Sequence, residues 1–180
     1  MRSYITLAVV ALFTLPAAAQ AQSLTLAADF GYDRVLDHDT SGPGFNIYPG
    51  LSLGPIRAEA QVGYHHGTTD PRLFGASDLR TTYIPMMLGG RVGIPLGILY
   101  PWVGAHGGFA YVGRTTQLSS RRGALSFTNH EWEPAFNVGG GVDLCFGPAS
   151  VGGALWYNSV MDPDDPMRIV SAAITVAIAL

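Results

Sequence analysis

The sequence predicts an all-β fold, an eight-stranded antiparallel up-and-down transmembrane β-barrel, on three observations. Apolar and polar residues alternate with a period of two over segments much longer than the ~5–6 residues of an ordinary soluble strand. The connections between these segments are alternately short and long. Within the segments, the charged residues share a face with glycines and polar residues, and the opposite face is apolar. Together these features are typical of a barrel that turns its apolar face to lipid.

Composition narrows the class of protein further. The chain has 180 residues, of which 48% are hydrophobic and 13% charged, so it forms one domain and is not disordered. A net charge of −3 without a basic run argues against a nucleic-acid partner. A single cysteine excludes an internal disulfide framework. Beyond the N-terminus no apolar run is long enough for a membrane helix.

Residues 1–21 are predicted to be a cleaved signal peptide. Arg2 is followed by an apolar run over 5–15, by Pro16 and then by small residues. The 19–21 triplet (AQA) predicts cleavage before Gln22, and the 17–19 triplet (AAA) is the alternative. The run is shorter than the ~20 residues of a transmembrane anchor. Loss of Arg2 changes the net charge from −3 to −4, and residues 22–180 form one exported barrel domain.

Residues 56–66 show the clearest alternation. Their apolar face consists of Ile56, Ala58, Ala60, Val62 and Tyr64. The same period predicts eight strands, over residues 24–33, 43–54, 56–66, 82–95, 99–112, 132–146, 149–158 and 168–180, of which the last is the weakest.

The connections also predict a membrane barrel. Short turns are expected at 54–55, 96–98 and 147–148. Long polar loops are expected over 34–42, 67–81, 113–131 and 159–167. Short turns at one end and long loops at the other are the transmembrane arrangement. A soluble lipocalin-like barrel, with its polar face outside, is the alternative interpretation of the same alternation.

The charged strand residues must face inward, because an Arg at the lipid-facing midplane costs ~2–4 kcal/mol. An eight-stranded barrel is about wide enough to be filled by side chains. The sequence therefore predicts an ion-pair cluster that satisfies these charges and closes the interior. Its members are Arg57, Glu59, Arg91, Asp29 and Asp143.

Bulky and aromatic residues fit the same arrangement. Inward glycines are expected to leave room for Tyr48, Trp102 and Trp156. Aromatic residues near the strand ends, among them Phe30 and Trp132, are expected to form two interfacial girdles.

Three strings carry a resemblance to a known family. Residues 83–91 (YIPMMLGGR), 101–111 (PWVGAHGGFAY) and 137–143 (NVGGGVD) resemble strands of the small outer-membrane β-barrel proteins, both the OmpX/OmpA/OmpW-like barrels and the opacity-type surface proteins. The resemblance implies a monomer in the bacterial outer membrane, in contact with lipopolysaccharide and inserted by the barrel-assembly machinery. Members commonly end in Phe, whereas this chain ends in Leu180, and His106 stands where Gly is frequent.

Arg114, Arg121 and Arg122 lie in the predicted 113–131 loop and could contact lipopolysaccharide phosphates. The alternative is an ordinary solvated loop. The 159–167 loop carries Asp162, Asp164 and Asp165, but without the spacing of a calcium loop.

No metal, cofactor or catalytic residue is predicted. His65 and His106 share the inward parity but His66 does not, so a shared zinc site is not expected, and His65 and His66 are interpreted as capping the strand at an aqueous rim. Ser150 and Ser159 have no histidine nearby in the sequence to activate them. The lone Cys145 is interpreted as packing.

Three functional hypotheses follow. The first is a non-enzymatic surface barrel that supports membrane integrity or adhesion through its long loops. The second is a narrow passage for small or hydrophobic solutes. The third is an enzyme that modifies lipid A, against which the absence of a histidine in the 156–159 string (WYNS) argues.

Overall fold

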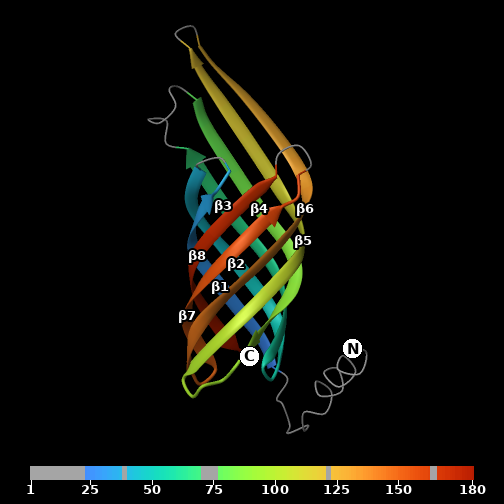
Figure 1. Ribbon diagram of the computed structural model, residues 1–180, viewed down its shortest axis with the longest axis vertical. Coiled ribbons are helices and arrows are strands. Elements are labelled where there is room, and N and C mark those ends of the chain that lie inside the picture. Colours follow the sequence, from blue (N-terminus) through green and yellow to red (C-terminus); the bar gives the residue numbers. More distant parts are fainter. Residues whose placement is uncertain (1–22, 38–39, 70–76, 121–122, 163–165) are drawn as a thin grey trace, which may run out of the picture.

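The computed structural model describes residues 23–37, 40–69, 77–120, 123–162 and 166–180, and shows a closed antiparallel barrel (Figure 1). The fold class predicted from the sequence is confirmed. The signal-peptide prediction falls on residues outside this described part. The strands are β1 (Ser23–Val35), β2 (Thr40–Leu53), β3 (Ile56–Thr69), β4 (Ser77–Gly93), β5 (Leu99–Ser120), β6 (Gly123–Phe146), β7 (Ala149–Val160) and β8 (Met167–Ala179).

Each strand pairs with its neighbours in the sequence, and β8 closes the barrel on β1. Asp29 of β1, for example, lies opposite Asn46 of β2 on one side and Thr175 of β8 on the other. The short turns contain Gly54, Gly97 and Gly147 at φ of 64°, 70° and 64°. Glycine adopts this left-handed backbone without a steric penalty, which explains its place in these turns.

The two faces of the wall confirm the predicted parity. Leu88 is 72% exposed on the outside and Val103 67%. Glu59 and Arg91 are 4% and 3% exposed on the inside. This arrangement is the reverse of a lipocalin-like barrel, so the soluble alternative is wrong. Exposed aromatic residues such as Phe109 and Trp132 complete the outer surface.

Among the described residues, no helix is both long enough and apolar enough to cross a bilayer.

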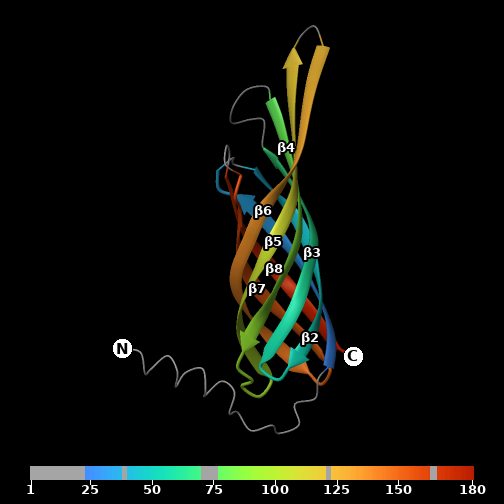
Figure 2. The same ribbon diagram turned by 90° about the vertical axis from the view of Figure 1, so that its right-hand side faces the viewer.

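The prediction of a loop over 113–131 is wrong. β5 and β6 stay paired from Leu99↔Leu144 to Ser120↔Gly123, and they project as a two-stranded ribbon beyond the other strands (Figures 1 and 2). Thr115 and Thr128 hydrogen-bond through their hydroxyls at 3.2 Å across this pair. Threonine is common in β-strands. The polar composition of residues 113–131 therefore does not mean that the strands end there. The loops predicted over 34–42, 67–81 and 159–167 are also shorter than expected, because the strands on either side of each loop extend into it.

Candidate functional site

The only direct ion pair within the predicted five-residue cluster, in the described part of the chain, joins β3 to β4. Arg91 Nε donates to Glu59 Oε1 at 2.6 Å, and the two side chains are 3% and 0% exposed. The Arg91 guanidinium also lies over three aromatic rings, 4.4 Å from the ring centre of Tyr48, 4.3 Å from that of Trp102 and 5.3 Å from that of Trp156. A desolvated cation gains from such ring faces. Arg91 is thus held by the Glu59 carboxylate and by the rings of Tyr48, Trp102 and Trp156, which we call the aromatic cage.

Asp29 is connected to Arg91 through the same rings. Its Oδ2 accepts hydrogen bonds from the Tyr48 hydroxyl at 2.9 Å and from Trp156 Nε1 at 3.1 Å. Trp156 in turn packs on Trp102, with ring centres 5.3 Å apart. The same rings therefore contact a buried cation and a buried carboxylate, although Asp29 Oδ1 and Arg91 Nη2 have no hydrogen-bond partner among the described residues.

Two glycines of β6 make room for these indoles. A side chain at Gly139 would collide with the Trp156 ring. A Cβ at Gly141 would lie 2.6 Å from Trp102 Cζ2. Substitution at either position would displace the cage.

Arg57 and Asp143 lie apart from the cage. Asp143 Oδ1 accepts from the Thr175 hydroxyl at 2.9 Å. Arg57 is half-buried and lines a hollow near the short turns together with Thr25 and Cys145. Within the described residues, Arg57 forms no ion pair with Glu59 or Asp143. The sequence placed five residues on the correct face but overestimated how many of them meet.

A line of hydrogen bonds that the sequence did not predict continues from Glu59. His106 Nε2 lies 2.8 Å from Glu59 Oε1, and its Nδ1 lies 2.8 Å from Asn137 Oδ1. Asn137 Nδ2 donates to Gln61 Oε1 at 2.6 Å.

The same line ends at a second carboxylate. Gln61 Nε2 donates to Asn46 Oδ1 at 2.9 Å, and His65 Nε2 lies 3.0 Å from that oxygen. His65 Nδ1 lies 2.5 Å from Asp33 Oδ2. We call this set the His–amide chain; its members are Glu59, His106, Asn137, Gln61, Asn46, His65 and Asp33.

The histidines are therefore not placed as the sequence suggested. His65 is 6% exposed and bonded inside the barrel, so its interpretation as an exposed rim residue is wrong. His65 and His106 are joined through three amides and share no ligand position. His66 lies on the outward parity, as expected.

Apolar side chains fill the interior toward the long-loop end. Tyr83 and Met167 are 2% and 0% exposed there. We call this set the outer apolar layer; it consists of Val35, Tyr83, Met87, Ala110, Val112, Ala135, Val160, Met167 and Ile169.

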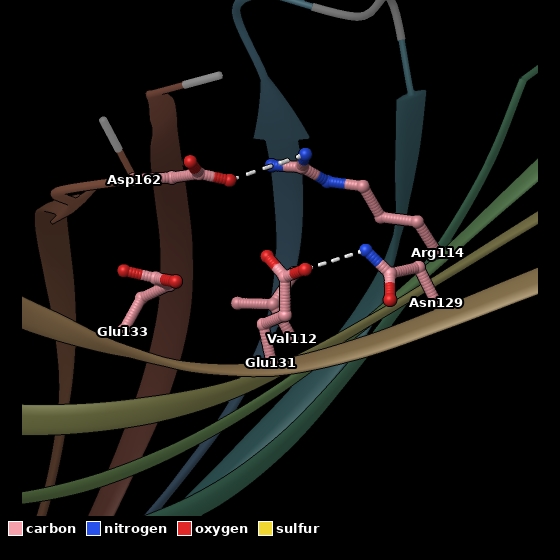
Figure 3. A pocket seen from close by; sticks show the side chains of 6 residues that line it. All are labelled: Val112, Arg114, Asn129, Glu131, Glu133 and Asp162. Atoms are coloured by element: carbon pink, nitrogen blue, oxygen red, sulfur yellow. Dashed lines mark hydrogen bonds and ion pairs between the residues drawn. The ribbon is translucent and has the colours of Figure 1, made fainter. Parts of the chain in front are cut away.

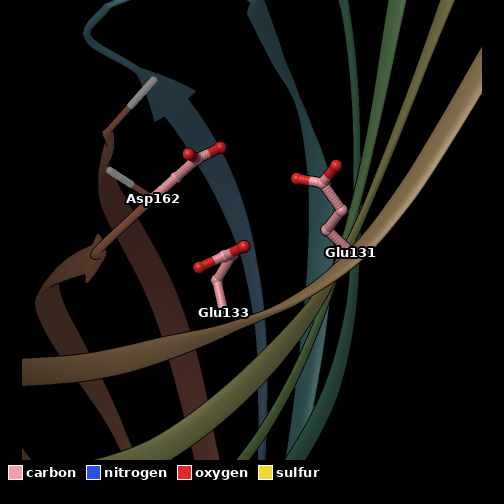
Figure 4. A group of neighbouring side chains, drawn as sticks. All are labelled: Glu131, Glu133 and Asp162. Carbon is pink, nitrogen blue, oxygen red and sulfur yellow. The ribbon is translucent and has the colours of Figure 1, made fainter. Parts of the chain in front are cut away.

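The mouth of the barrel carries a small charged pocket (Figure 3). Arg114 reaches toward Asp162, with Nη1 3.4 Å from Oδ2. Carboxylate oxygens of Glu131, Glu133 and Asp162 lie within 4.8 Å of one another (Figure 4). Arg114 thus points into the mouth, not outward to the lipid. Arg121, Arg122 and the aspartates at 164 and 165 lie outside the described residues.

Two outward arginines were overlooked in the sequence. Arg168 on β8 is exposed and bonds Asp37 through its guanidinium and its backbone N–H. Arg34 on β1 is exposed opposite Val170, two residues from Arg168. Parity could have identified Arg34, because it follows the outward Tyr32 by two residues.

The sequence raised Ser150 and Ser159 as candidate nucleophiles. Among the described residues, neither serine forms a side-chain hydrogen bond with His65 or His106. The buried imidazoles are engaged by carboxylates and amides.

No family model and no curated protein matches this sequence. Solved structures do resemble its fold. Neisserial surface protein A has a TM-score of 0.59 at 13% identity, over 88% of this chain and 97% of that one. A major outer membrane protein from Thermus thermophilus has a TM-score of 0.60 at 12% identity, over 89% and 100%. The attachment invasion locus protein Ail of Yersinia pestis, in complex with the heparin analogue sucrose octasulfate, has 0.54 at 10%, over 88% and 99%.

These likenesses agree with the distribution of side chains on the barrel, which is apolar outside and polar inside. An apolar outer surface around a polar interior is the pattern of a transmembrane barrel. By its fold and its apolar outer surface, the chain is a small eight-stranded transmembrane β-barrel, similar in fold to outer-membrane proteins.

Proposed function

We propose that this barrel is a non-enzymatic surface protein that acts through the β5–β6 ribbon. The observation that carries the proposal is the length of that ribbon, which stays paired to Ser120↔Gly123 beyond all other strands (Figure 2). A paired ribbon that continues beyond the other strands extends away from the membrane. Such a projection suits adhesion better than a purely structural role in the membrane.

The filled interior supports a surface role over a passage. The aromatic cage around Arg91, the His–amide chain and the outer apolar layer occupy successive parts of the lumen. An eight-stranded barrel has little space beyond its side chains. We therefore do not propose a porin-like function.

The absence of a Ser–His contact among the described residues supports a non-enzymatic role. Nucleophilic catalysis needs the hydroxyl and its base within hydrogen-bond reach. The histidines that are buried here already contact Glu59 and Asp33.

We further propose that lipopolysaccharide phosphates contact Arg34 and Arg168 at the outer rim, in addition to the arginines predicted from the sequence, of which Arg121 and Arg122 lie outside the described residues. Arginine binds phosphate through a fork of N–H donors. Replacing both by Gln should reduce the lipopolysaccharide that copurifies with the barrel. Arg80→Gln, at an outward position on β4, is the matched control; an equal reduction there would contradict the assignment.

The ribbon is tested by shortening it. Residues 116–127 are replaced by Asn-Gly, a favoured two-residue hairpin turn, so that Thr115 and Thr128 remain paired. Cells that carry the shortened protein should lose adherence to epithelial monolayers at an equal surface level. The mobility shift between boiled and unboiled samples on SDS gels checks that the barrel still folds. Unchanged adherence would contradict the proposal, and detergent sensitivity after gene deletion would then favour a role in membrane integrity.

A further inference from the structure

We propose that the His–amide chain is a two-proton switch, in which His65 and His106 gain or lose their protons together. The coupling element is the row of amides between them, Asn137, Gln61 and Asn46. This inference does not depend on the surface role proposed above.

In the orientation observed, each imidazole faces an acceptor oxygen at both nitrogens. His106 lies between Glu59 Oε1 and Asn137 Oδ1, each at 2.8 Å. His65 lies between Asp33 Oδ2 at 2.5 Å and Asn46 Oδ1 at 3.0 Å. A neutral imidazole has one donor and one acceptor, whereas an imidazolium has two donors. All four contacts are hydrogen bonds only when both rings are protonated.

The amides transmit this requirement from one ring to the other. If His106 loses the proton on Nδ1, that nitrogen needs a donor, and Asn137 supplies one by turning its amide over. The Asn137 oxygen then faces Gln61, which must turn in the same way, and Gln61 in turn requires Asn46 to turn. The turned Asn46 presents N–H to His65 Nε2, which can accept it only after losing its own proton.

In both end states every contact along the row from Glu59 to Asp33 is a hydrogen bond, and in mixed states at least one contact is not. With one ring protonated and the other neutral, two oxygens or two N–H groups must face each other somewhere in the row. A buried polar group left without its partner destabilises the state that contains it. Protonation of one histidine therefore favours protonation of the other.

The charges around the rings fit the doubly protonated state. The ionisable groups that face His106 are Glu59 on β3, Arg91 on β4 and Tyr48 on β2; Asp33 on β1 and Tyr83 on β4 face His65. Apart from the mouth, the described interior has four carboxylates and two guanidinium groups. Two imidazolium ions bring the positive groups to four as well. The groups counted are Asp29, Asp33, Glu59, Asp143, Arg57 and Arg91.

The experiment is an NMR titration of the full mature barrel in detergent micelles, with labelled histidine rings. His65 and His106 should titrate at one common midpoint with a Hill slope above one. His66 and His130, on the outside, should titrate with a slope of one and serve as internal controls. The side-chain amide signals of Asn137, Gln61 and Asn46 should shift over the same pH interval.

Two variants test the coupling itself. Gln61→Met, close in shape but unable to relay, should reduce the slope for both rings to one. His65→Gln should do the same for His106. Asn158→Leu removes a buried amide that bonds Ser171 outside the chain, and it should leave the slope unchanged.

The titration of the unmodified protein can by itself contradict the proposal. Separate midpoints with slopes of one for His65 and His106 would show independent titration. A slope that stays above one in folded Gln61→Met would show that the amides do not transmit the coupling. If Gln61→Met shows no boiling-dependent gel shift and so does not fold, the unmodified protein and His65→Gln decide the matter.

Discussion

The two ends of the barrel interior are filled by different chemistry. Toward the short turns, the aromatic cage holds Arg91, and the His–amide chain runs from Glu59 beside it to His65, which packs on Tyr83 of the outer apolar layer. Toward the long loops, the outer apolar layer packs without a hydrogen-bonded network of that kind. The comparison shows that contacts in the polar part are specific, because removing one partner leaves a buried charge without a counter-charge or hydrogen bond. The apolar part needs only volume and excludes water from the polar part.

The largest loss in the free energy of unfolding is expected on substitution of Arg91 in the polar part. Arg91→Met removes the guanidinium partner of the buried Glu59 and leaves that carboxylate only His106, and breaking a buried pair costs about 3–5 kcal/mol. Urea unfolding in micelles, followed by the gel-shifted fraction, measures the free energy of unfolding. The double variant Glu59→Leu/Arg91→Met should lose less than Arg91→Met alone. If the double variant loses as much free energy of unfolding as Arg91→Met or more, the unpaired charge of Glu59 is not the cause of the loss.

A smaller loss is expected in the outer apolar layer. Met167→Ala removes a side chain that is 0% exposed and should cost about 2–3 kcal/mol, the lower part of the range for such truncations, because the layer adjoins the open mouth. Met86→Ala, at a lipid-facing position 47% exposed, is the matched control and should cost less in the same unfolding assay. Equal losses would mean that the layer is not a packed seal.

The third effect concerns one hydrogen bond to a buried carboxylate. Thr175→Val keeps the shape of the side chain but removes the donor to Asp143, so it should cost about 1.5–2 kcal/mol. Thr25→Val on the adjacent β1 is the control, because the Thr25 hydroxyl has no hydrogen-bond partner among the described residues. The two midpoints of urea unfolding are compared directly. A Thr25→Val loss as large as that of Thr175→Val would contradict the account.

The smallest effect lies on the outside. Arg168→Gln breaks the exposed pair with Asp37, and exposed pairs contribute little to stability. The midpoint of urea unfolding should stay unchanged within error. A loss comparable to that of Arg91→Met would remove the distinction between inside and outside charges.

Much of this architecture could be predicted from the sequence, since alternation fixes which side of a strand each residue faces. Asp29, Glu59 and Arg91 were placed inside for that reason. The partners could not be predicted, because cross-strand contacts depend on register and on the tilt of the strands. Gln61 and Asn137 are 76 positions apart and meet only once the barrel closes.

The errors have physical reasons as well. The 113–131 segment was predicted as a loop because it is polar, but polarity reports solvent and not the end of a strand. His65 was assigned to an exposed rim because the strand was predicted to end at residue 66, whereas β3 continues to Thr69. Each error came from setting a strand end where the membrane ends.

The central claim is that side chains close the interior, and single-channel recording in planar lipid bilayers tests it most directly. The unmodified barrel should give no current steps, and the variant with Arg57→Ser and Arg91→Ser should show a gain in conductance if it remains folded on gels. Regular current steps from the unmodified barrel would contradict the claim and would make a passage the better account of this protein.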